Sequence, residues 1–161
     1  MVLNFLLVFG VVLIDQLSKQ WVVRFFESVG DSIPIINGVL HLTYITNDGA
    51  AFGMLDNCRW LFLLISAVAI AAMPVLLYVY RKSGNLIRFG LCFIAGGGIG
   101  NMIDRLFYPG GEVVDFIDFR LIHFAVFNIA DSFVTIGCAL IFLYFIKCEI
   151  LPYFRAKKDS V

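Results

Sequence analysis

The sequence has few charged residues and no excess of either sign. Charged side chains make up 15% of its 161 residues, and twelve Lys and Arg balance twelve Asp and Glu. About a quarter of the residues in an average soluble domain are charged, so this chain is not typical of a soluble protein. A net charge of zero also argues against the broad basic face that nucleic-acid binding requires. The composition therefore predicts an integral membrane protein with no nucleic-acid partner.

Several motifs of common soluble sites are absent. The four cysteines lack the spacing of zinc ligands, and we interpret them as small buried apolar residues rather than as metal ligands or disulfides. They are Cys58, Cys92, Cys138 and Cys148. The glycine-rich run 96–101 lacks the Lys-Ser/Thr pair of a phosphate-binding loop, which argues against a nucleotide site. The N-terminus lacks the basic region and small-residue cleavage site of a signal peptide, so we retain its apolar run as a helix.

Long apolar runs are what the chain has in abundance. Hydrophobic residues make up 61% of the sequence, and the mean hydropathy is +0.93. A helix that spans a bilayer needs roughly 20 apolar residues, and four runs reach or approach this length. They cover residues 2–26, 60–80, 86–107 and 129–151. The sequence thus predicts an all-α membrane protein, a four-transmembrane-helix bundle, in which residues 1–161 form a single integral membrane domain.

Basic residues indicate how the bundle is oriented. They gather beside the link between the second and third runs and at the end of the chain. These residues are Arg81, Lys82 and Arg88, and then Lys147, Arg155, Lys157 and Lys158. Four spans place both groups and both termini on one side, and the excess of Lys and Arg predicts that this side is cytoplasmic. Ten of the twelve acids, all but Glu149 and Asp159, then lie in the outer half or outside.

Two segments between the spans, residues 28–58 and 108–127, are expected on the outer side. In the first, Ile33–Ile36 and Val39–Ile45 have the composition of short strands around an Asn-Gly turn. In the second, Val113–Ile117 suits another short strand. We therefore expect a small extracytoplasmic β-sheet at the membrane surface beside the bundle.

Four aspartates crowd into the stretch from residue 101 to residue 131. They are Asp104, Asp115, Asp118 and Asp131. Carboxylates at or near bilayer depth are costly and are kept mainly where they carry function. Asp115 and Asp131 each lie where a polar segment meets an apolar run, and we hypothesise that these two converge on one water molecule.

Two neighbouring carboxylates can perform hydrolysis without a metal ion. They cannot both ionise at low cost, so one keeps a proton near neutral pH. The ionised member takes a proton from water, and the protonated member donates a hydrogen bond to the scissile carbonyl. This reasoning predicts the chemistry, but it does not by itself establish which two aspartates pair.

Other polar residues of the spans lie at helical spacing. Asn101 and Asp104 are three residues apart and share a face. Asp15 and Lys19 are four apart and can pair across one turn, either as an ion pair that locks the bundle or with one of them touching substrate. We expect Arg105 to form an ion pair with Asp104, which gives that carboxylate a structural role.

The fourth run carries a polar stripe of Asn128, Asp131 and Thr135, which should face the bundle interior or a wet cleft. Asn128 is placed to orient a carboxylate or the substrate backbone. Gly96 and Gly100 form a small-residue pair that lets another helix approach closely.

The histidines and the late aromatic run receive ordinary structural interpretations. We interpret His41 and His123 as surface or packing residues, and residues 124–127 as part of an interfacial aromatic belt.

Five short sequence blocks occur along the chain in a characteristic order. They are Asp-Gln-x-x-Lys (Asp15 to Lys19), Asn-x-Gly-Ala-Ala-Phe-Gly (Asn47 to Gly53), Gly-Asn-x-x-Asp-Arg (Gly100 to Arg105), Val-Val-Asp-Phe (Val113 to Phe116) and Phe-Asn-x-Ala-Asp-Ser (Phe127 to Ser132). In this order the chain closely resembles the bacterial lipoprotein signal peptidases, the type II signal peptidases. The resemblance extends from the first helix to the fourth.

The resemblance implies a function and a site. Its catalytic aspartates fall on Asp115 and Asp131. Its other motif positions fall on Asp15, Asn47, Gly49, Asn101, Asp104, Arg105, Asn128 and Ala130. It implies an intramembrane aspartic endopeptidase that cleaves a diacylglyceryl-modified prolipoprotein before its lipidated Cys. It also implies a bacterial plasma-membrane location, a surface β-cradle and inhibition by globomycin. No metal or other cofactor is expected.

Three rival functions use some of the same residues. A transporter or proton channel would need acids in a chain across the membrane, whereas these cluster at one edge. A metal-dependent phospholipid-head-group transferase would gather aspartates at the cytoplasmic side, and sensitivity to chelators would distinguish it. A Ser-Lys protease would need Lys19 beside Ser18, which points to a different helix face, or beside Ser132 on another helix.

Overall fold

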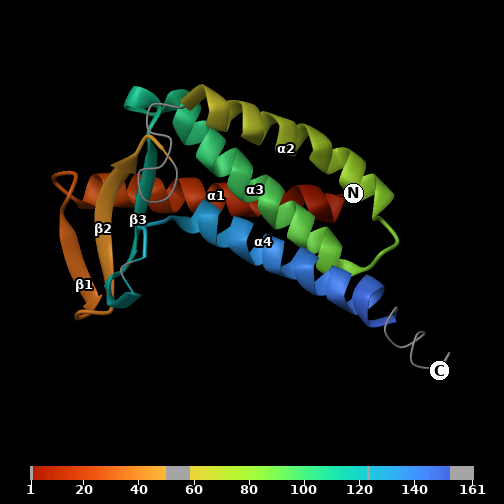
Figure 1. The fold of residues 1–161 in the computed structure, drawn as a ribbon. Helices are drawn as coiled ribbons and strands as arrows, with labels where there is room; N and C mark the ends of the chain where they lie inside the picture. Colours follow the sequence, from red (N-terminus) through yellow and green to blue (C-terminus); the bar gives the residue numbers. More distant parts are fainter. Residues whose placement is uncertain (1, 50–58, 123, 153–161) are drawn as a thin grey trace.

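The protein is a long bundle of helices with a small β-sheet at one end (Figure 1). The structure is a computed structural model that describes residues 2–49, 59–122 and 124–152. The helices are α1 (Val2–Phe25), α2 (Arg59–Val79), α3 (Asn85–Phe107) and α4 (Ile129–Phe145), with a π-helical continuation η4 (Ile146–Ile150). The strands are β1 (Ser32–Ile36), β2 (Leu40–Asn47) and β3 (Val113–Phe119), and the short 3₁₀ helices η2 (Pro109–Gly111) and η3 (Arg120–Ile122) flank β3. The expected fold class, four long helices with a small sheet, is confirmed.

All four helices are long and apolar enough to cross a membrane. Their outer faces carry large apolar side chains, among them Phe5, Trp60 and Phe107, which are 69%, 77% and 80% exposed. Such a continuous apolar surface is unfavourable in water and favourable against lipid chains. The expectation that residues 1–161 form one membrane domain stays a prediction.

Helix α3 is the centre of the bundle and packs against α1, α2 and α4. Its glycines allow this. Gly96 and Gly100 both face α1, as the predicted small-residue contact requires. Gly90 meets α4, where an added Cβ would lie 2.8 Å from the Gly137 carbonyl oxygen. Because no side chain separates these backbones, polar groups on α1, α3 and α4 can reach one another.

The sheet is antiparallel with strand order β1-β2-β3. All three predicted strands are present, and Gly38 takes a φ of 70° in the turn between β1 and β2. The β2–β3 register is irregular between Leu42 and Ile45, and Ile45 lies opposite Asp115. This irregularity was not predictable from the alternation of residues.

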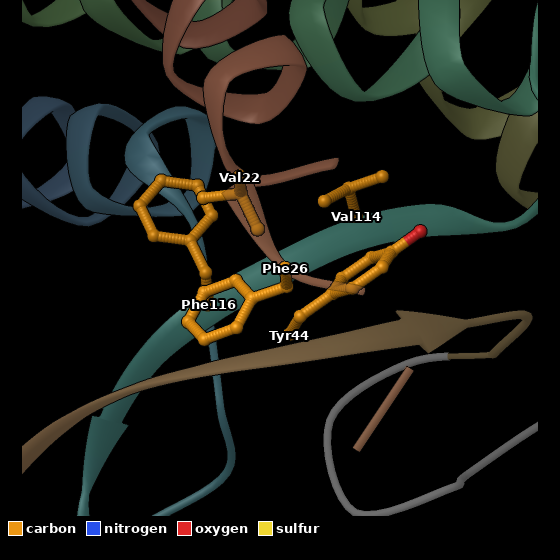
Figure 2. Close-up of a cluster of buried hydrophobic side chains, with 5 residues drawn as sticks. All are labelled: Val22, Phe26, Tyr44, Val114 and Phe116. Atoms are coloured by element: carbon orange, nitrogen blue, oxygen red, sulfur yellow. The ribbon is translucent and has the colours of Figure 1, made fainter. Parts of the chain in front are cut away.

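A cluster of buried apolar side chains joins the sheet to the end of α1 (Figure 2). Its members are Val22, Phe26, Tyr44, Val114 and Phe116. Successive residues of a strand point to opposite faces, so Val114 and Phe116 anchor β3 to this cluster while Asp115 points the other way. Burial of the cluster thus fixes the direction of a candidate catalytic side chain.

The cysteine prediction is partly wrong. Cys92, Cys138 and Cys148 are free thiols, as expected, and Cys92 is buried. Cys138 and Cys148 are instead exposed on the surface of the helical region. A free thiol behaves as a small apolar group, so lipid chains would accommodate these two side chains as well as a protein core would. Cys58 lies outside the described residues.

Candidate active site

Asp115 on β3 and Asp131 on α4 line one cavity of about 390 Å³. The cavity lies where α3, β3 and the start of α4 meet. Its lining also includes Asn47, Gly49, Asn101, Arg105, Val113, Val134, Thr135 and residues 124–127. Six of the eleven predicted site residues therefore converge on one space, although they are spread from residue 47 to residue 131.

Asn128 contacts both carboxylates. It is fully buried and caps α4, with its side chain accepting a hydrogen bond from the Asp131 backbone N–H at 2.9 Å. Its own backbone N–H donates to Asp131 Oδ2 at 3.2 Å, which completes a capping box. Its Nδ2 donates to Asp115 Oδ1 at 2.6 Å. One helix cap thus positions both aspartates.

Asn101 of α3 orients Asp131. Its Nδ2 donates to Asp131 Oδ1 at 2.7 Å. Its Oδ1 accepts hydrogen bonds from Lys19 Nζ at 2.9 Å and from Asn128 Nδ2 at 3.1 Å. Because an ammonium group can only donate, the Asn101 oxygen must face Lys19 and the amide nitrogen must face Asp131.

Lys19 is buried between two carboxylates. Its Nζ lies 2.9 Å from Asp15 Oδ2 and 2.9 Å from Asp104 Oδ2. Asp15 is fully buried and accepts a hydrogen bond from the Ala130 backbone N–H at 2.9 Å, while Gln16 donates to Asp104 at 2.8 Å. The predicted Asp15–Lys19 pair is confirmed. It forms part of a larger network that ties α1, α3 and α4 together and reaches Asp131 through Asn101. We call the two cavity aspartates, Asp115 and Asp131, the dyad.

The expected ion pair between Asp104 and Arg105 is wrong. Adjacent helical residues point about 100° apart, so Asp104 faces Lys19 on α1 while Arg105 faces the cavity. The Arg105 Nη2 donates to the Gly49 carbonyl oxygen at 3.2 Å, and its guanidinium lies 4.6 Å from the centre of the Phe62 ring. Arg105 therefore places a positive charge beside the dyad.

Asn47 reaches Asp115 from the end of β2. Its Nδ2 donates to Asp115 Oδ2 at 3.1 Å, and its Oδ1 accepts from the Gly49 backbone N–H at 3.0 Å. This local turn is typical of Asn in Asn-x-Gly segments and fixes the direction of the amide. Residues 50–53, which complete this motif, lie outside the described residues.

The surroundings of Asp115 favour its protonated form. Burial of the side chain, which is 2% exposed, and the charge of Asp131 together raise the pKa of Asp115 to about 7. The hydrogen bonds from Asn47 and Asn128 act in the opposite direction and do not cancel the effect. Asp115 can therefore hold a proton near neutral pH.

Asp118 belongs to a different cluster. Thr43 Oγ1 donates to Asp118 Oδ2 at 2.7 Å, and Arg120 Nε donates to the same oxygen at 2.9 Å. Burial opposes the charge of Asp118, but these hydrogen bonds and the Arg120 cation outweigh it and lower its pKa. His41 is buried in the same sheet beside Ser32, at 3.3 Å from its hydroxyl, which agrees with a packing role. His123 lies outside the described residues.

Two features of the site were missed from the sequence. Residues 124–127 were assigned to an interfacial belt, but they line the cavity. The Phe127 carbonyl oxygen accepts the Ile117 N–H at 2.8 Å, which holds this run beside β3. Its position directly before Asn128 was the available signal. The second feature is Gln16, which bonds to Asp104 and whose place in the Asp-Gln-x-x-Lys block was the available signal.

Within residues 2–49, 59–122 and 124–152, no group of three or more His, Cys, Asp or Glu side chains could hold a metal ion. The metal-free mechanism stays a prediction.

The sequence model of a family described as signal peptidase (SPase) II matches residues 7–147. The chain belongs to the signal peptidase II family. It is 44% identical to the lipoprotein signal peptidase of Brevibacillus brevis, over 83% of this chain and 87% of that protein. It is 45% identical to the lipoprotein signal peptidase of Halothermothrix orenii, over 87% of this chain and 92% of that protein.

Signal peptidase II membership agrees with the fold. Two solved structures described as bacterial membrane enzymes superpose with TM-scores of 0.80 and 0.77, each at 33% identity. The first match covers 91% of this chain and 89% of the other, and the second covers 92% and 95%. The family is one of aspartic peptidases. Together with the four apolar helices, it makes this chain a multi-pass membrane aspartic endopeptidase.

Proposed function

We propose that this signal peptidase II family member removes the signal peptide from prolipoproteins by direct water attack between Asp115 and Asp131. The observation that carries this proposal is that both carboxylates line one cavity and bond to the same residue, Asn128. An aspartic dyad needs two carboxyl groups close enough to share one proton.

The environments of the two aspartates suggest their roles. Asp115 is the more deeply buried and has the raised pKa, so it begins protonated and acts as the general acid. Asp131 lies in the first turn of α4, where the helix N-terminus favours negative charge, so we assign it the role of the base.

Each step then follows from proton transfer. Asp131 removes a proton from water as the water oxygen bonds to the scissile carbonyl carbon. Asp115 delivers its proton to the carbonyl oxygen, which gives a tetrahedral diol. Collapse of the diol breaks the C–N bond as one hydroxyl returns its proton to Asp115, and the proton on Asp131 passes to the leaving amine. No covalent enzyme intermediate forms, and Arg105 and Asn47 remain available to bind the substrate backbone.

The substrate proposed for this site is a prolipoprotein whose Cys already carries diacylglycerol, cut on the N-terminal side of that Cys. The cavity wall supports this because residues 124–127 and Val134 give it a largely apolar side. The bundle also exposes large apolar side chains to the lipid that would hold the diacylglyceryl chains. Globomycin is proposed to inhibit by occupying the same cavity.

The enzyme is proposed to lie in the bacterial plasma membrane with both termini in the cytoplasm and the dyad near the extracytoplasmic face. The placement of Lys and Arg supports this orientation. Figure 1 adds that the N-terminus and the α2–α3 link lie at the end of the bundle opposite the sheet.

Incubation of the purified enzyme with matched lipidated and unlipidated prolipoprotein tests this function, with cleavage read as a gel shift. We expect cleavage of the lipidated form, unchanged by chelators, and little or none of the unlipidated form. Equal rates on both would remove the lipid from recognition. Loss of activity with EDTA, restored by a divalent metal, would refute the metal-free mechanism.

A further inference from the structure

A second groove, which shares no lining residue with the cavity of Asp115 and Asp131, lies among α1, α2 and α3. It has a volume of about 570 Å³. Its wall is apolar, with Val8, Ile70, Met73, Leu77, Ala95 and Ile99 among its residues. Arg81 and Arg88 line one end of it. This is the end of the bundle that carries the α2–α3 link, opposite the sheet (Figure 1).

The groove has the length of one membrane leaflet. Arg88 and Ile99 are eleven residues apart on α3, and a rise of 1.5 Å per residue separates them by roughly 16 Å along the helix axis. The hydrocarbon core of a bilayer is about 30 Å thick. The groove therefore runs from one membrane surface to about the midplane, which is the depth that one acyl chain occupies.

Neither arginine at the groove end has an acidic partner in the part of the chain that the structure describes. Within the described residues, no carboxylate lies within salt-bridge distance of Arg81 or Arg88. The Arg88 Nε is buried and has no hydrogen-bond partner among those residues. A buried donor left unsatisfied is destabilising. The Arg81 side chain contacts Tyr78, through the Tyr78 carbonyl oxygen at 3.1 Å and the ring at 4.1 Å.

We propose that this groove binds an anionic phospholipid, with an acyl chain along its apolar wall and the phosphate between Arg81 and Arg88. Basic pockets between membrane helices are suited to anionic head groups. A phosphate would accept charge-assisted hydrogen bonds from the two guanidinium groups, and the Arg88 Nε would gain a partner if that side chain turned toward the phosphate. A signal peptide in this groove would place its basic N-terminal region against the two arginines, so charge disfavours that occupant. The site goes beyond the peptidase activity and does not depend on it.

Lipid binding to the purified full-length enzyme in detergent tests the proposal. The probes are dioleoyl phosphatidylglycerol and dioleoyl phosphatidylcholine, which share acyl chains and differ in charge. Native mass spectrometry measures the lipid that is retained. The test variant is Arg81→Gln with Arg88→Gln. The matched control is Lys82→Gln with Lys147→Gln, because both lysines are exposed and lie outside the groove lining.

We expect phosphatidylglycerol to bind more tightly than phosphatidylcholine and the double arginine variant to weaken its binding roughly 30-fold. The double lysine control should retain the preference. Glycerol phosphate, which has a head group without chains, should neither bind nor displace the lipid. Equal retention by the arginine variant, loss in the lysine control, or equivalent binding of glycerol phosphate would overturn the proposal.

A measurement on the unaltered enzyme covers the case in which the arginine variant fails to fold. Phosphatidylglycerol with a photoreactive group at its acyl end is crosslinked, and the labelled peptides are identified. Labelling should centre on Ile70–Leu77 and Ala95–Ile99, and excess phosphatidylglycerol should suppress it. Labelling elsewhere, or suppression by prolipoprotein and not by phosphatidylglycerol, would refute the lipid site.

Discussion

At the scale of single residues, the two aspartates of the cavity differ from Asp15, Asp104 and Asp118 in what faces them. Asp→Asn keeps the size of the side chain and removes its proton chemistry. We expect Asp115→Asn and Asp131→Asn each to lower cleavage by roughly 10²- to 10⁴-fold or more, with near-normal yields of folded protein. Asp118→Asn should keep substantial activity because Asp118 bonds to Thr43 and Arg120.

The measurement is cleavage per unit of folded protein, with thermal unfolding recorded for each variant. Full activity in either Asp115→Asn or Asp131→Asn would eliminate the dyad mechanism.

Lys19 makes a separate prediction about stability. Lys19→Met leaves Asp15 and Asp104 buried without their shared cation, and removal of one partner from a buried ion pair costs roughly 3–5 kcal/mol. The expected result is a large fall in the thermal-unfolding midpoint in detergent. Arg120→Gln is the matched control, because its ion pair with Asp118 is 44% exposed on the arginine side and is worth at most about 1 kcal/mol. Equal effects of the two variants would contradict this account.

At this scale, ion pairs within one helix were predictable from the sequence, and ion pairs between helices were not. Asp15 and Lys19 were paired correctly because a spacing of four brings them together on any α-helix. Asp104 was paired with its neighbour Arg105 because nothing in the sequence states which helix packs on which. The true partner, Lys19, is 85 positions away, and only the contact between α1 and α3 brings it near.

At the scale of elements, most of the architecture was predictable. The length of an apolar run sets a membrane helix, and an Asn-Gly turn between β-branched runs sets a hairpin. The irregular β2–β3 register and the return of residues 124–127 along β3 were not predictable. Both depend on backbone hydrogen bonds between distant segments, such as Ile117 with Phe127.

The contact between α3 and α4 gives the prediction at this scale. A Cβ at Gly90 would lie 2.7 Å from Ile141 Cγ1 and 2.8 Å from the Gly137 carbonyl oxygen, so Gly90→Ala must push α4 away. We expect a loss of about 1–3 kcal/mol and reduced cleavage, because α4 carries Asp131. Gly98→Ala is the control on the same helix, since its Cβ would meet nothing within 4 Å, and it should be neutral or slightly stabilising. Thermal unfolding and cleavage rates measure both, and similar behaviour of the two variants would refute the close-packing argument.

At the scale of the whole molecule, the raised pKa of Asp115 should govern how the enzyme responds to pH. Its pKa is about 7 in the folded protein and 3.8 in an unperturbed chain. Between these values the folded state holds more protons than the unfolded state, so the free energy of unfolding should fall as pH rises from about 4 to about 7. Asp115→Asn should remove this contribution, as thermal unfolding across the pH range will measure.

Cleavage should also fall as pH rises through about 7, because the pair then loses the proton that the carbonyl oxygen needs. Initial rates of cleavage of the lipidated substrate, measured at each pH with the substrate at the same multiple of KM, test this. A rate that continues to rise well above neutrality would exclude Asp115 as the acid.

Orientation in the membrane is a further property of the whole chain. Reporter fusions at Val161 and near Asn85 should behave as cytoplasmic, and a fusion near Asn37 as external, because Lys and Arg gather beside the first two sites. A C-terminal reporter that is active outside the cell would overturn the four-span topology.

The contacts of Asn128 with both aspartates have a consequence for the synthesis and membrane insertion of the enzyme. Synthesis proceeds from the N-terminus, so α1, the sheet and α3 emerge before the segment that carries Asn128 and Asp131. Until that last helix enters the membrane and its cap forms, Asp115 has neither its carboxylate partner nor the amide at 2.6 Å that positions it. If the proposed dyad is correct, we therefore expect a nascent or truncated chain that ends before α4 to be proteolytically inert, and insertion of the final helix to activate the protease.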